Sequence, residues 1–244
     1  MVDTRHRSFL KAFMWRSSAF MLLGSITWFL TADFKMAIYT TLVYHTLQVF
    51  THYIHERVWA GIAWGKSRGL AIQMTGMSGA GKTTLAQIVA DRLRGSGYLV
   101  EVIDGDEYRA GLCSDLGFSK KDRNTNIRRL GFVSNVLCRN NVISIIAAIN
   151  PYSEIRDELT SSVYGIKTVY VKCDLGTLKD RDTKGLYRRA LLQDGDPDKV
   201  YSFTGISDMY EPPASPDLLI ETNLELLDES VNKLENFIMR CCDE

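Results

Sequence analysis

Residues Gly76–Thr83 match the phosphate-binding loop pattern G-x-x-x-x-G-K-[ST] at every position. Glycines let successive backbone N–H groups turn inward around phosphates, Lys82 reaches the β- and γ-phosphates, and the Thr83 hydroxyl can hold Mg²⁺. A short buried strand is expected just before the loop, at 69–75, and a helix just after it, at 84–93. The loop therefore predicts binding of a nucleoside triphosphate. The expected contacts are Gly76, Ser78, Gly79, Ala80, Gly81, Lys82, Thr83 and Thr84.

Two carboxylates follow the second expected strand, which covers 98–103. Beside a triphosphate, Asp104 and Asp106 suit two tasks, ordering Mg²⁺ and accepting a proton from an acceptor hydroxyl. We assign the metal to Asp104 together with Thr83, and we expect Lys82, Asp104 and Asp106 to be catalytic. Arg109 can then bind an anionic group of a second substrate with its forked guanidinium. The alternative is that Asp106 only caps the following helical turn.

From residue 69 onward, expected strands and helices alternate along the chain. Further strands are expected at 141–148, 167–173 and 218–220, and further helices at 123–139, 153–164 and 226–240. This alternation predicts an α/β fold, in which helices cover both faces of a parallel sheet and ligands bind at the carboxyl ends of the strands. With the phosphate loop, the sheet is expected to be of the P-loop NTPase type.

The first 68 residues differ in composition from the rest of the chain. They hold 8 Lys or Arg and 3 Asp or Glu, against 21 and 26 in the remainder, together with all four Trp and all four His. The five Cys all lie later and show no C-x-x-C spacing, as is typical of reduced thiols. The break predicts two domains, an N-terminal two-helix module at 1–68 and a catalytic domain at 69–244.

Two uncharged apolar stretches predict that the N-terminal module is a helical hairpin. Ser17–Ala32 and Met36–Ile54 are about 16 and 19 residues long, which is close to the lower bound for crossing a bilayer. Basic residues precede the first stretch and follow the second, so the positive-inside rule puts both ends and the catalytic domain on the cytoplasmic side of a membrane. A helical pair that packs on the catalytic domain or dimerises is the alternative.

Five motifs in the catalytic part, all in the same order, resemble the adenylyl-sulfate kinase family. They are Asp104–Leu112, Asp115–Ser119, Asp122–Arg129, Lys184–Ala190 and Phe203–Ile206, with Tyr210–Pro212 behind the last. The likeness covers about residues 69–240, which would make this part a P-loop kinase domain. It implies transfer of the γ-phosphoryl group of ATP, with Mg²⁺, to the 3′-hydroxyl of adenylyl sulfate. A looser resemblance joins residues 8–65 to short bacterial membrane proteins of unknown function.

The resemblance also implies roles for single residues. Asp106 would be the base or the group that orients the acceptor hydroxyl. Phe118 and Phe203 would sandwich the adenine, and Lys184 would lie in a mobile lid. The implied substrate contacts are Asp106, Arg109, Phe118, Arg123, Asn126, Ile149, Asn150, Lys184 and Phe203.

The segment after the third strand departs from the family. The family usually has Ile-Ser-Pro-Tyr there, and its serine can carry a phosphoryl group, whereas this chain has Ile149–Tyr152 with asparagine at position 150. Since an amide cannot form a phosphoserine, we expect direct in-line transfer from ATP to the acceptor. Ser153 stands where many members have arginine, and the lid carries extra residues at 193–198 that make it more acidic than expected.

Other functions stay open at this stage. The altered loop at Asn150 is compatible with a different small-molecule hydroxyl acceptor, and a membrane nucleotide sensor without turnover is a further alternative. The intact Lys82, Thr83, Asp104 and Asp106 argue against a sensor. Nucleic-acid binding is not expected, because the part beyond residue 68 is net acidic and has no basic face interleaved with aromatics. The oligomeric state, including a homodimer, is left open.

Overall fold

The computed structural model describes residues 5–61, 69–182 and 184–243. The chain divides into two compact units, Met1–Lys66 and Ser67–Glu244. Each unit has its own secondary structure, with helices alone in the first unit and a sheet with helices in the second.

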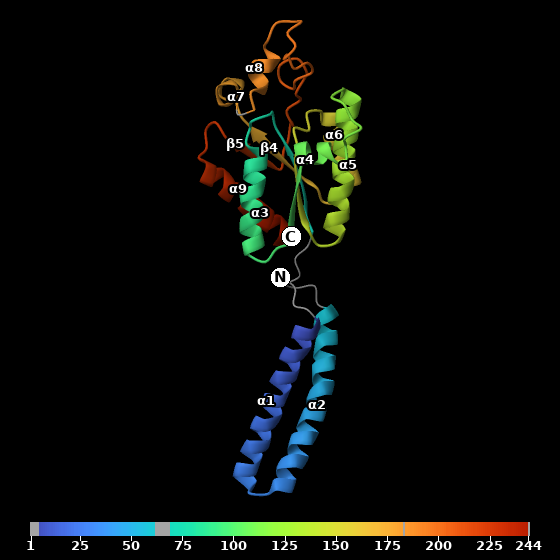
Figure 1. Cartoon of the computed structure of the whole chain (residues 1–244), viewed down its shortest axis with the longest axis vertical. Coiled ribbons are helices and arrows are strands. Elements are labelled where there is room, and N and C mark those ends of the chain that lie inside the picture. Colours follow the sequence, from blue (N-terminus) through green and yellow to red (C-terminus); the bar gives the residue numbers. More distant parts are fainter. Residues whose placement is uncertain (1–4, 62–68, 183, 244) are drawn as a thin grey trace. The chain divides into compact units, whose positions relative to one another are not determined.

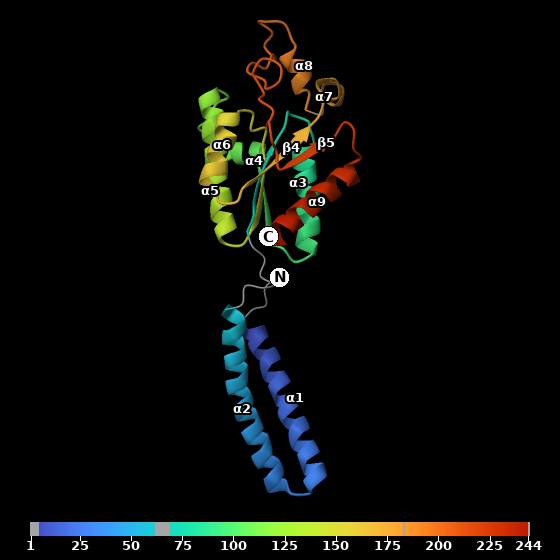
Figure 2. The same ribbon diagram turned by 180° about the vertical axis from the view of Figure 1, so that it is seen from behind.

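The first unit is a pair of helices that lie side by side, α1 (Arg5–Thr31) and α2 (Phe34–Gly61) (Figures 1 and 2). The turn between them is stabilised by Asp33, whose Oδ1 accepts hydrogen bonds from the backbone N–H groups of Lys35 at 2.8 Å and Met36 at 3.2 Å. This is the geometry of a helix N-cap, so the chain reverses where the apolar stretches are interrupted. The predicted helical hairpin is confirmed.

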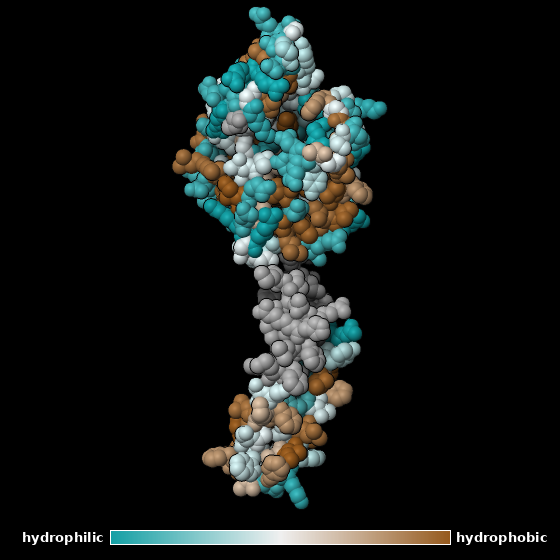
Figure 3. Space-filling view, viewed as in Figure 1, coloured by the Kyte–Doolittle hydropathy of each residue, from teal (hydrophilic) through white to brown (hydrophobic). Residues whose placement is uncertain are grey.

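Many large apolar side chains of the helical pair are exposed. Phe29 is 86% and Leu30 76% exposed, and apolar and weakly polar residues cover much of the described part of this unit in Figure 3. Polar Thr and His side chains are interspersed among them, and every described Thr of the pair donates its hydroxyl hydrogen bond to a carbonyl of its own helix. Among the described helices, none is both long enough and apolar enough to cross a membrane.

The second unit is built on a five-stranded parallel sheet in the order β2-β3-β1-β4-β5. The strands are β1 (Ala71–Thr75), β2 (Val100–Asp104), β3 (Ile143–Ala147), β4 (Lys167–Lys172) and β5 (Leu218–Glu221). Helices α3 (Lys82–Gly95) and α9 (Leu227–Asp243) cover one face, and α5 (Lys120–Arg139) and α6 (Ser153–Ser162) cover the other (Figures 1 and 2). The predicted α/β fold of the P-loop type is confirmed.

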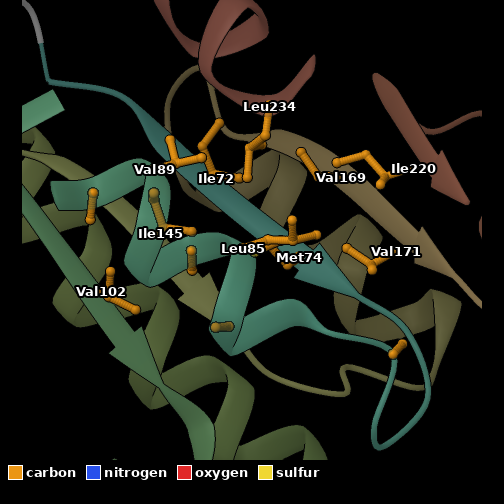
Figure 4. Close-up of a cluster of buried hydrophobic side chains, with 14 of the residues drawn as sticks. Ile72, Met74, Leu85, Val89, Val102, Ile145, Val169, Val171, Ile220 and Leu234 are labelled. Carbon is orange, nitrogen blue, oxygen red and sulfur yellow. The ribbon is translucent and has the colours of Figure 1, made fainter. Parts of the chain in front are cut away.

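The two faces of the sheet carry separate hydrophobic clusters. On one face, Ile72 and Met74 of β1 pack with Leu85 of α3 and Leu234 of α9 (Figure 4). On the other face, a second cluster joins strands β1, β2 and β3 to α5 and α6. Every residue of β1 and of β3 is buried. Parallel strands covered on both faces read as continuous apolar runs, which is why these two strands were evident in the sequence.

Three short helices were not predicted. They are α4 (Gly105–Ala110), α7 (Leu175–Arg181) and α8 (Leu186–Ala190). Each is two turns or less, too short for an apolar period to be recognised. The first two begin at side-chain caps, since Asp104 accepts from the backbone N–H of Asp106 and Asp174 from that of Thr177. Two of them, α4 and α8, carry residues that line a pocket at the edge of the sheet where the strands end.

Candidate active site

A pocket of about 430 Å³ lies at the carboxyl ends of the strands. It contains every predicted site residue except Gly76 and Ala80. Those that line it are Ser78, Gly79, Gly81, Lys82, Thr83, Thr84, Asp104, Asp106, Arg109, Phe118, Arg123, Asn126, Ile149, Asn150, Lys184 and Phe203. The side chains come from six separate segments of the chain, so the fold brings together residues up to 125 positions apart in the sequence.

The phosphate loop runs from the end of β1 to the start of α3, and two of its residues shape it from behind. Gly76 has φ of 154°, and a Cβ atom there would lie 2.2 Å from the carbonyl oxygen of Val171 in the neighbouring strand, so only glycine fits. Ala80 is fully buried, and its carbonyl accepts a hydrogen bond from Thr222 at 3.1 Å. Both residues set the path of the loop without lining the pocket.

The ammonium group of Lys82 is turned back onto the loop. Its Nζ donates to the carbonyl oxygens of Gly76 and Met77, each at 2.8 Å, and the residue is 7% exposed. Burial lowers the pKa of Lys82 to about 8, although the carboxylates of Asp106 and Asp104 act in the opposite direction. A buried, partly neutralised amine that faces an anion site is poised to gain charge when phosphate arrives.

Asp104 joins the phosphate loop to α4 through its two carboxylate oxygens. Oδ2 accepts from the Thr83 hydroxyl at 2.7 Å, and Oδ1 accepts from the backbone N–H groups of Asp106 at 2.8 Å and Glu107 at 3.2 Å. The cap of α4 is therefore Asp104, and the alternative prediction that Asp106 only caps this turn is wrong. The Asp106 side chain is left to face the pocket.

The Thr83–Asp104 pair fits a small divalent cation. A hydroxyl and a carboxylate are hard oxygen donors, and Mg²⁺ in phosphoryl-transfer sites takes one or two such protein groups, with phosphates and waters as its other ligands. Across the residues that the structure describes, no cluster of three or more His, Cys, Asp or Glu side chains could hold a metal ion. The metal that fits this pocket is thus one that depends on the nucleotide for most of its ligands.

An ion pair crosses the pocket from α4 to the segment before α8. The Nζ atom of Lys184 donates to Oδ2 of Asp106 at 2.5 Å, and both side chains are largely exposed. The next residue, Gly185, has φ of 64° and donates its N–H to the carbonyl of Asp182 at 2.8 Å. This left-handed turn directs Lys184 over the mouth of the pocket.

The two phenylalanines differ in their surroundings. Phe203 is 7% exposed and meets the ring of Tyr187 edge-on, with ring centroids 4.9 Å apart. Phe118 is 59% exposed, and the guanidinium of Arg109 lies 4.8 Å from its ring centroid. Because both line the same pocket, one rigid and one freer aromatic face are available to a flat base.

Tyr187 and Asp208 are two residues that the sequence analysis did not assign to the site. The Tyr187 hydroxyl donates to the carbonyl of Ser78 in the phosphate loop at 2.8 Å, so this tyrosine joins that loop to Phe203. The carboxylate of Asp208 lies 3.5 Å from Nε of Arg123. Tyr187 lies inside the Lys184–Ala190 motif, which was a usable signal. Nothing near Asp208 in the sequence indicates its long-range partner.

Asn150 lines the pocket, but its amide nitrogen is engaged beneath it. Nδ2 donates to Oε1 of Gln73 at 3.1 Å, and the Gln73 amide in turn donates to Thr168 at 3.0 Å. Asn150 is 1% exposed and has φ of 44°, a left-handed conformation that asparagine tolerates better than most residues. The backbone carbonyl of Asn150 accepts hydrogen bonds from the Thr75 hydroxyl at 2.9 Å and from the Arg156 guanidinium at 2.8 Å.

Comparison with known proteins gives two family matches. The model for adenylylsulphate kinase matches residues 68–221, and a model described as a predicted membrane protein matches residues 9–60. The adenylyl-sulfate kinase of Rippkaea orientalis is 48% identical over 169 residues, 69% of this chain and 91% of the relative. That of Microcystis aeruginosa is 47% identical over 171 residues, 70% of this chain and 92% of the relative.

Solved structures match the second unit. The APS kinase of Mycobacterium tuberculosis in complex with AMPPNP and APS is 32% identical, with a TM-score of 0.65 over 71% of this chain and 99% of that one. A hexameric APS kinase from Thiobacillus denitrificans is 31% identical, with a TM-score of 0.52 over 72% of this chain and 29% of that one.

Proposed function

This chain belongs to the adenylyl-sulfate kinase family, and we propose that its pocket transfers the γ-phosphoryl group of ATP to the 3′-hydroxyl of adenylyl sulfate. One observation carries the assignment of the site. Lys82 and Thr83 of the phosphate loop and Asp106 and Arg123 from α4 and α5 line a single pocket. The groups for a phosphoryl donor and those for an anionic, hydroxyl-bearing acceptor thus share one space.

The donor half of the site binds ATP through the phosphate loop. Backbone N–H groups at the start of α3 point toward the phosphates, where the helix dipole favours negative charge. Lys82 leaves the carbonyls of Gly76 and Met77 and donates to the β- and γ-phosphate oxygens. The Tyr187 hydroxyl, which donates a hydrogen bond to the Ser78 carbonyl, keeps the phosphate loop in its conformation as Lys82 moves. Phosphoryl transfer depends mainly on such positioning and on neutralisation of charge.

Thr83 and Asp104 would hold Mg²⁺ beside the phosphates. The ion, when bound, supplies positive charge to the γ-phosphoryl oxygens as they separate from the leaving group. Asp104 keeps one oxygen on the N–H groups of α4 and has the other free to turn from the Thr83 hydroxyl.

The acceptor half centres on Asp106. Its Oδ2 accepts the proton of the 3′-hydroxyl once Lys184, which donates a hydrogen bond to that same oxygen, has moved away. The released lysine is free to neutralise charge on the transferring group or on the acceptor. Arg109 and Arg123 bind the anionic part of the acceptor, and the adenine lies between Phe118 and Phe203. Asn150 contributes to the floor of the pocket, and its lack of a hydroxyl supports direct in-line transfer.

The N-terminal module, residues 1–68, is proposed to attach the enzyme to the cytoplasmic side of a membrane. Support comes from the match of residues 9–60 to a family described as predicted membrane proteins and from the exposed apolar side chains of α1 and α2. ATP is available on the cytoplasmic side. Membranes from cells that express the full chain are washed with alkaline carbonate. Retention in the membrane pellet supports attachment, and complete release contradicts it.

The proposed reaction is tested with the full-length enzyme. ADP release is followed in a coupled assay with ATP, Mg²⁺ and either adenylyl sulfate or another hydroxyl acceptor such as shikimate or gluconate. The proposal expects ADP release that requires adenylyl sulfate and a product that carries a new 3′-phosphate. ADP release that depends only on another acceptor, or none at all with a folded enzyme, contradicts it.

A further inference from the structure

A buried arginine at the acceptor end of the pocket is held by a carboxylate behind it. Arg123, in the first turn of α5, is 8% exposed. Its Nη2 donates to the carbonyl of Ser202 at 2.6 Å, and its Nε donates to the carbonyl of Phe118 at 3.0 Å and lies 3.5 Å from Oδ2 of Asp208. Asp208 is not one of the described residues that line the pocket. Asp208 can therefore act on a ligand only through its neighbours, and Arg123 is the one among them whose charged side chain lines the pocket.

The carboxylate of Asp208 is itself fixed by Tyr152. The tyrosine hydroxyl donates to both carboxylate oxygens, at 3.0 and 2.9 Å. Tyr152 is 3% exposed, and burial together with the charge of Asp208 raises the pKa of its hydroxyl to about 12, so it stays a donor at neutral pH. The backbone N–H of Asp208 also donates to the carbonyl of Phe203 at 3.1 Å.

Three segments of the site therefore meet at Asp208. They are the start of α5 with Arg123, the residue Tyr152 that follows the Asn150 loop, and the turn that begins at Phe203. A shift of the carboxylate would be felt in all three. The arrangement is a supporting contact behind groups that face the pocket, which is how buried side chains are held in one productive rotamer.

The charges at this point favour a fixed orientation over free movement. Burial lowers the pKa of Arg123. The largest effect that raises this pKa is the negative charge of Asp208. The neighbouring Arg109 acts in the same direction as burial. Two guanidinium groups that share a pocket repel each other, so without Asp208 the buried one would turn away or draw in water. With Asp208, its planar fork keeps one direction, as bidentate recognition of an anion requires.

We propose that Asp208, oriented by Tyr152, is a positioning residue that fixes the Arg123 guanidinium for the anionic part of adenylyl sulfate. The inference rests on the proposed function of the same pocket. It predicts that loss of the Asp208 charge weakens binding of the acceptor and leaves the transfer step nearly intact, because Lys82 and Asp106 keep their places. The Tyr152 hydroxyl acts on Arg123 through Asp208.

The experiment compares steady-state kinetics of the full-length wild type with Asp208→Asn, Tyr152→Phe and the double variant. Asp208→Asn is expected to raise the KM for adenylyl sulfate about tenfold, equivalent to about 1.4 kcal/mol, with kcat changed less than about twofold. Tyr152→Phe is expected to raise the KM about threefold. Because both act through one contact, the double variant should be no worse than Asp208→Asn alone.

Glu158→Gln is the matched control. It breaks the ion pair between Glu158 of α6 and Arg128 of α5, whose atoms are 2.6 Å apart away from the pocket, and should leave both constants unchanged. Thermal unfolding checks that each variant is folded. If Asp208→Asn does not fold, Asp208→Glu keeps the charge but displaces it, and the same rise in KM is expected.

The outcomes separate this inference from the proposed function. The role of Asp208 is overturned if the wild type is active on adenylyl sulfate and the KM of Asp208→Asn is equal to or lower than that of the wild type. A drop in kcat equal to the rise in KM also overturns it, since the residue would then support the transfer step. Effects of the two single variants that multiply in the double variant would overturn the route through Tyr152. A folded wild type without any activity on adenylyl sulfate contradicts the proposed function itself, and the inference with it.

Discussion

The ammonium group of Lys184 lies 2.5 Å from the carboxylate of Asp106, so the proposed base is paired with a lysine from the segment before α8. Both side chains are largely exposed, and an exposed pair of this kind contributes little to stability, typically about 0–1 kcal/mol. In the proposed mechanism the acceptor hydroxyl and Lys184 compete for one oxygen of Asp106, which would link release of the lysine to arrival of the acceptor.

Asp106→Asn should lower kcat by at least about a hundredfold, because an amide cannot accept the proton and general-base contributions are of that order. The KM for ATP should change little, since the phosphate loop is untouched. The coupled assay, with ATP varied at saturating adenylyl sulfate, measures both constants. Asp194→Asn is the control, because Asp194 makes a similar pair with Lys199 at 2.6 Å in the lid and does not line the pocket. Equal kcat values for Asp106→Asn and the control would show that Asp106 is not the base.

Binding of an ATP analogue should be coupled to uptake of a proton by Lys82. Burial lowers the pKa of this amine to about 8, so about half is neutral at pH 8 in the free enzyme. Phosphate oxygens favour the ammonium form and raise the pKa again. The affinity should therefore fall as the pH rises through about 8, and below about pH 7 it should become independent of pH.

Calorimetric titration in buffers of different ionisation enthalpy measures the proton uptake directly. Lys82→Arg is the informative variant, since a guanidinium stays charged throughout this range and should abolish the uptake. Gln and Met at this position would also remove it but would weaken binding more. Uptake that persists in Lys82→Arg would assign the proton to another group.

Asp104→Asn should raise the Mg²⁺ concentration needed for half-maximal activity by about tenfold and leave the fold nearly unchanged. Asparagine is as good a helix N-cap as aspartate, so the bonds to the N–H groups of Asp106 and Glu107 are retained. The lost negative charge should act mainly on the cation, with a smaller effect on the nearby Lys82 ammonium. Mg²⁺ titration of activity, with the thermal midpoint as the stability check, measures both effects. An unchanged Mg²⁺ requirement would remove Asp104 from the metal site.

The parts of this molecule that the sequence predicts well are those with local signals. The phosphate loop is a contiguous pattern, and β1 and β3 are unbroken apolar runs because both faces of the sheet are covered. The turn at Asp33 coincides with the break between two apolar stretches. The helix expected at 84–93 is α3, which covers Lys82–Gly95 and so extends two residues further at each end. Lys82 and Thr83 already have helical geometry.

Other parts could not be predicted because they depend on contacts between distant segments. Asp104 and Asp106 are equally good helix caps by residue type. The helix begins at Gly105 in the structure, so Asp104 is its N-cap and faces the free N–H groups. Asp208 lies 85 positions from Arg123, and no local pattern relates them. The direction of the Asn150 amide depends on its hydrogen bond to Gln73 in the middle of β1. No local sequence pattern relates these two residues.

Asn150→Ser should destabilise the enzyme by about 1–3 kcal/mol, the usual result of leaving a buried polar partner unsatisfied. The shorter side chain cannot reach Oε1 of Gln73, and serine is less tolerant than asparagine of the left-handed conformation at this position. Urea unfolding followed by circular dichroism measures the loss. Ser153→Ala, at an exposed position three residues further on, removes a hydroxyl that donates a hydrogen bond to Glu211 at 2.6 Å and serves as a surface control, with a smaller expected effect.

The wild type and Asn150→Ser together also test whether the phosphoryl group passes directly from ATP to the acceptor. With γ-³²P-ATP and no acceptor, the wild type should remain unlabelled, because no hydroxyl stands at position 150 and the phosphoryl group passes directly to the acceptor. Asn150→Ser places a hydroxyl on the pocket floor and provides a matched site at which label could appear. A label on the wild type that is chased off by adenylyl sulfate would contradict direct transfer. An unlabelled and fully active wild type would support direct transfer in the pocket that Lys82, Thr83, Asp104 and Asp106 line.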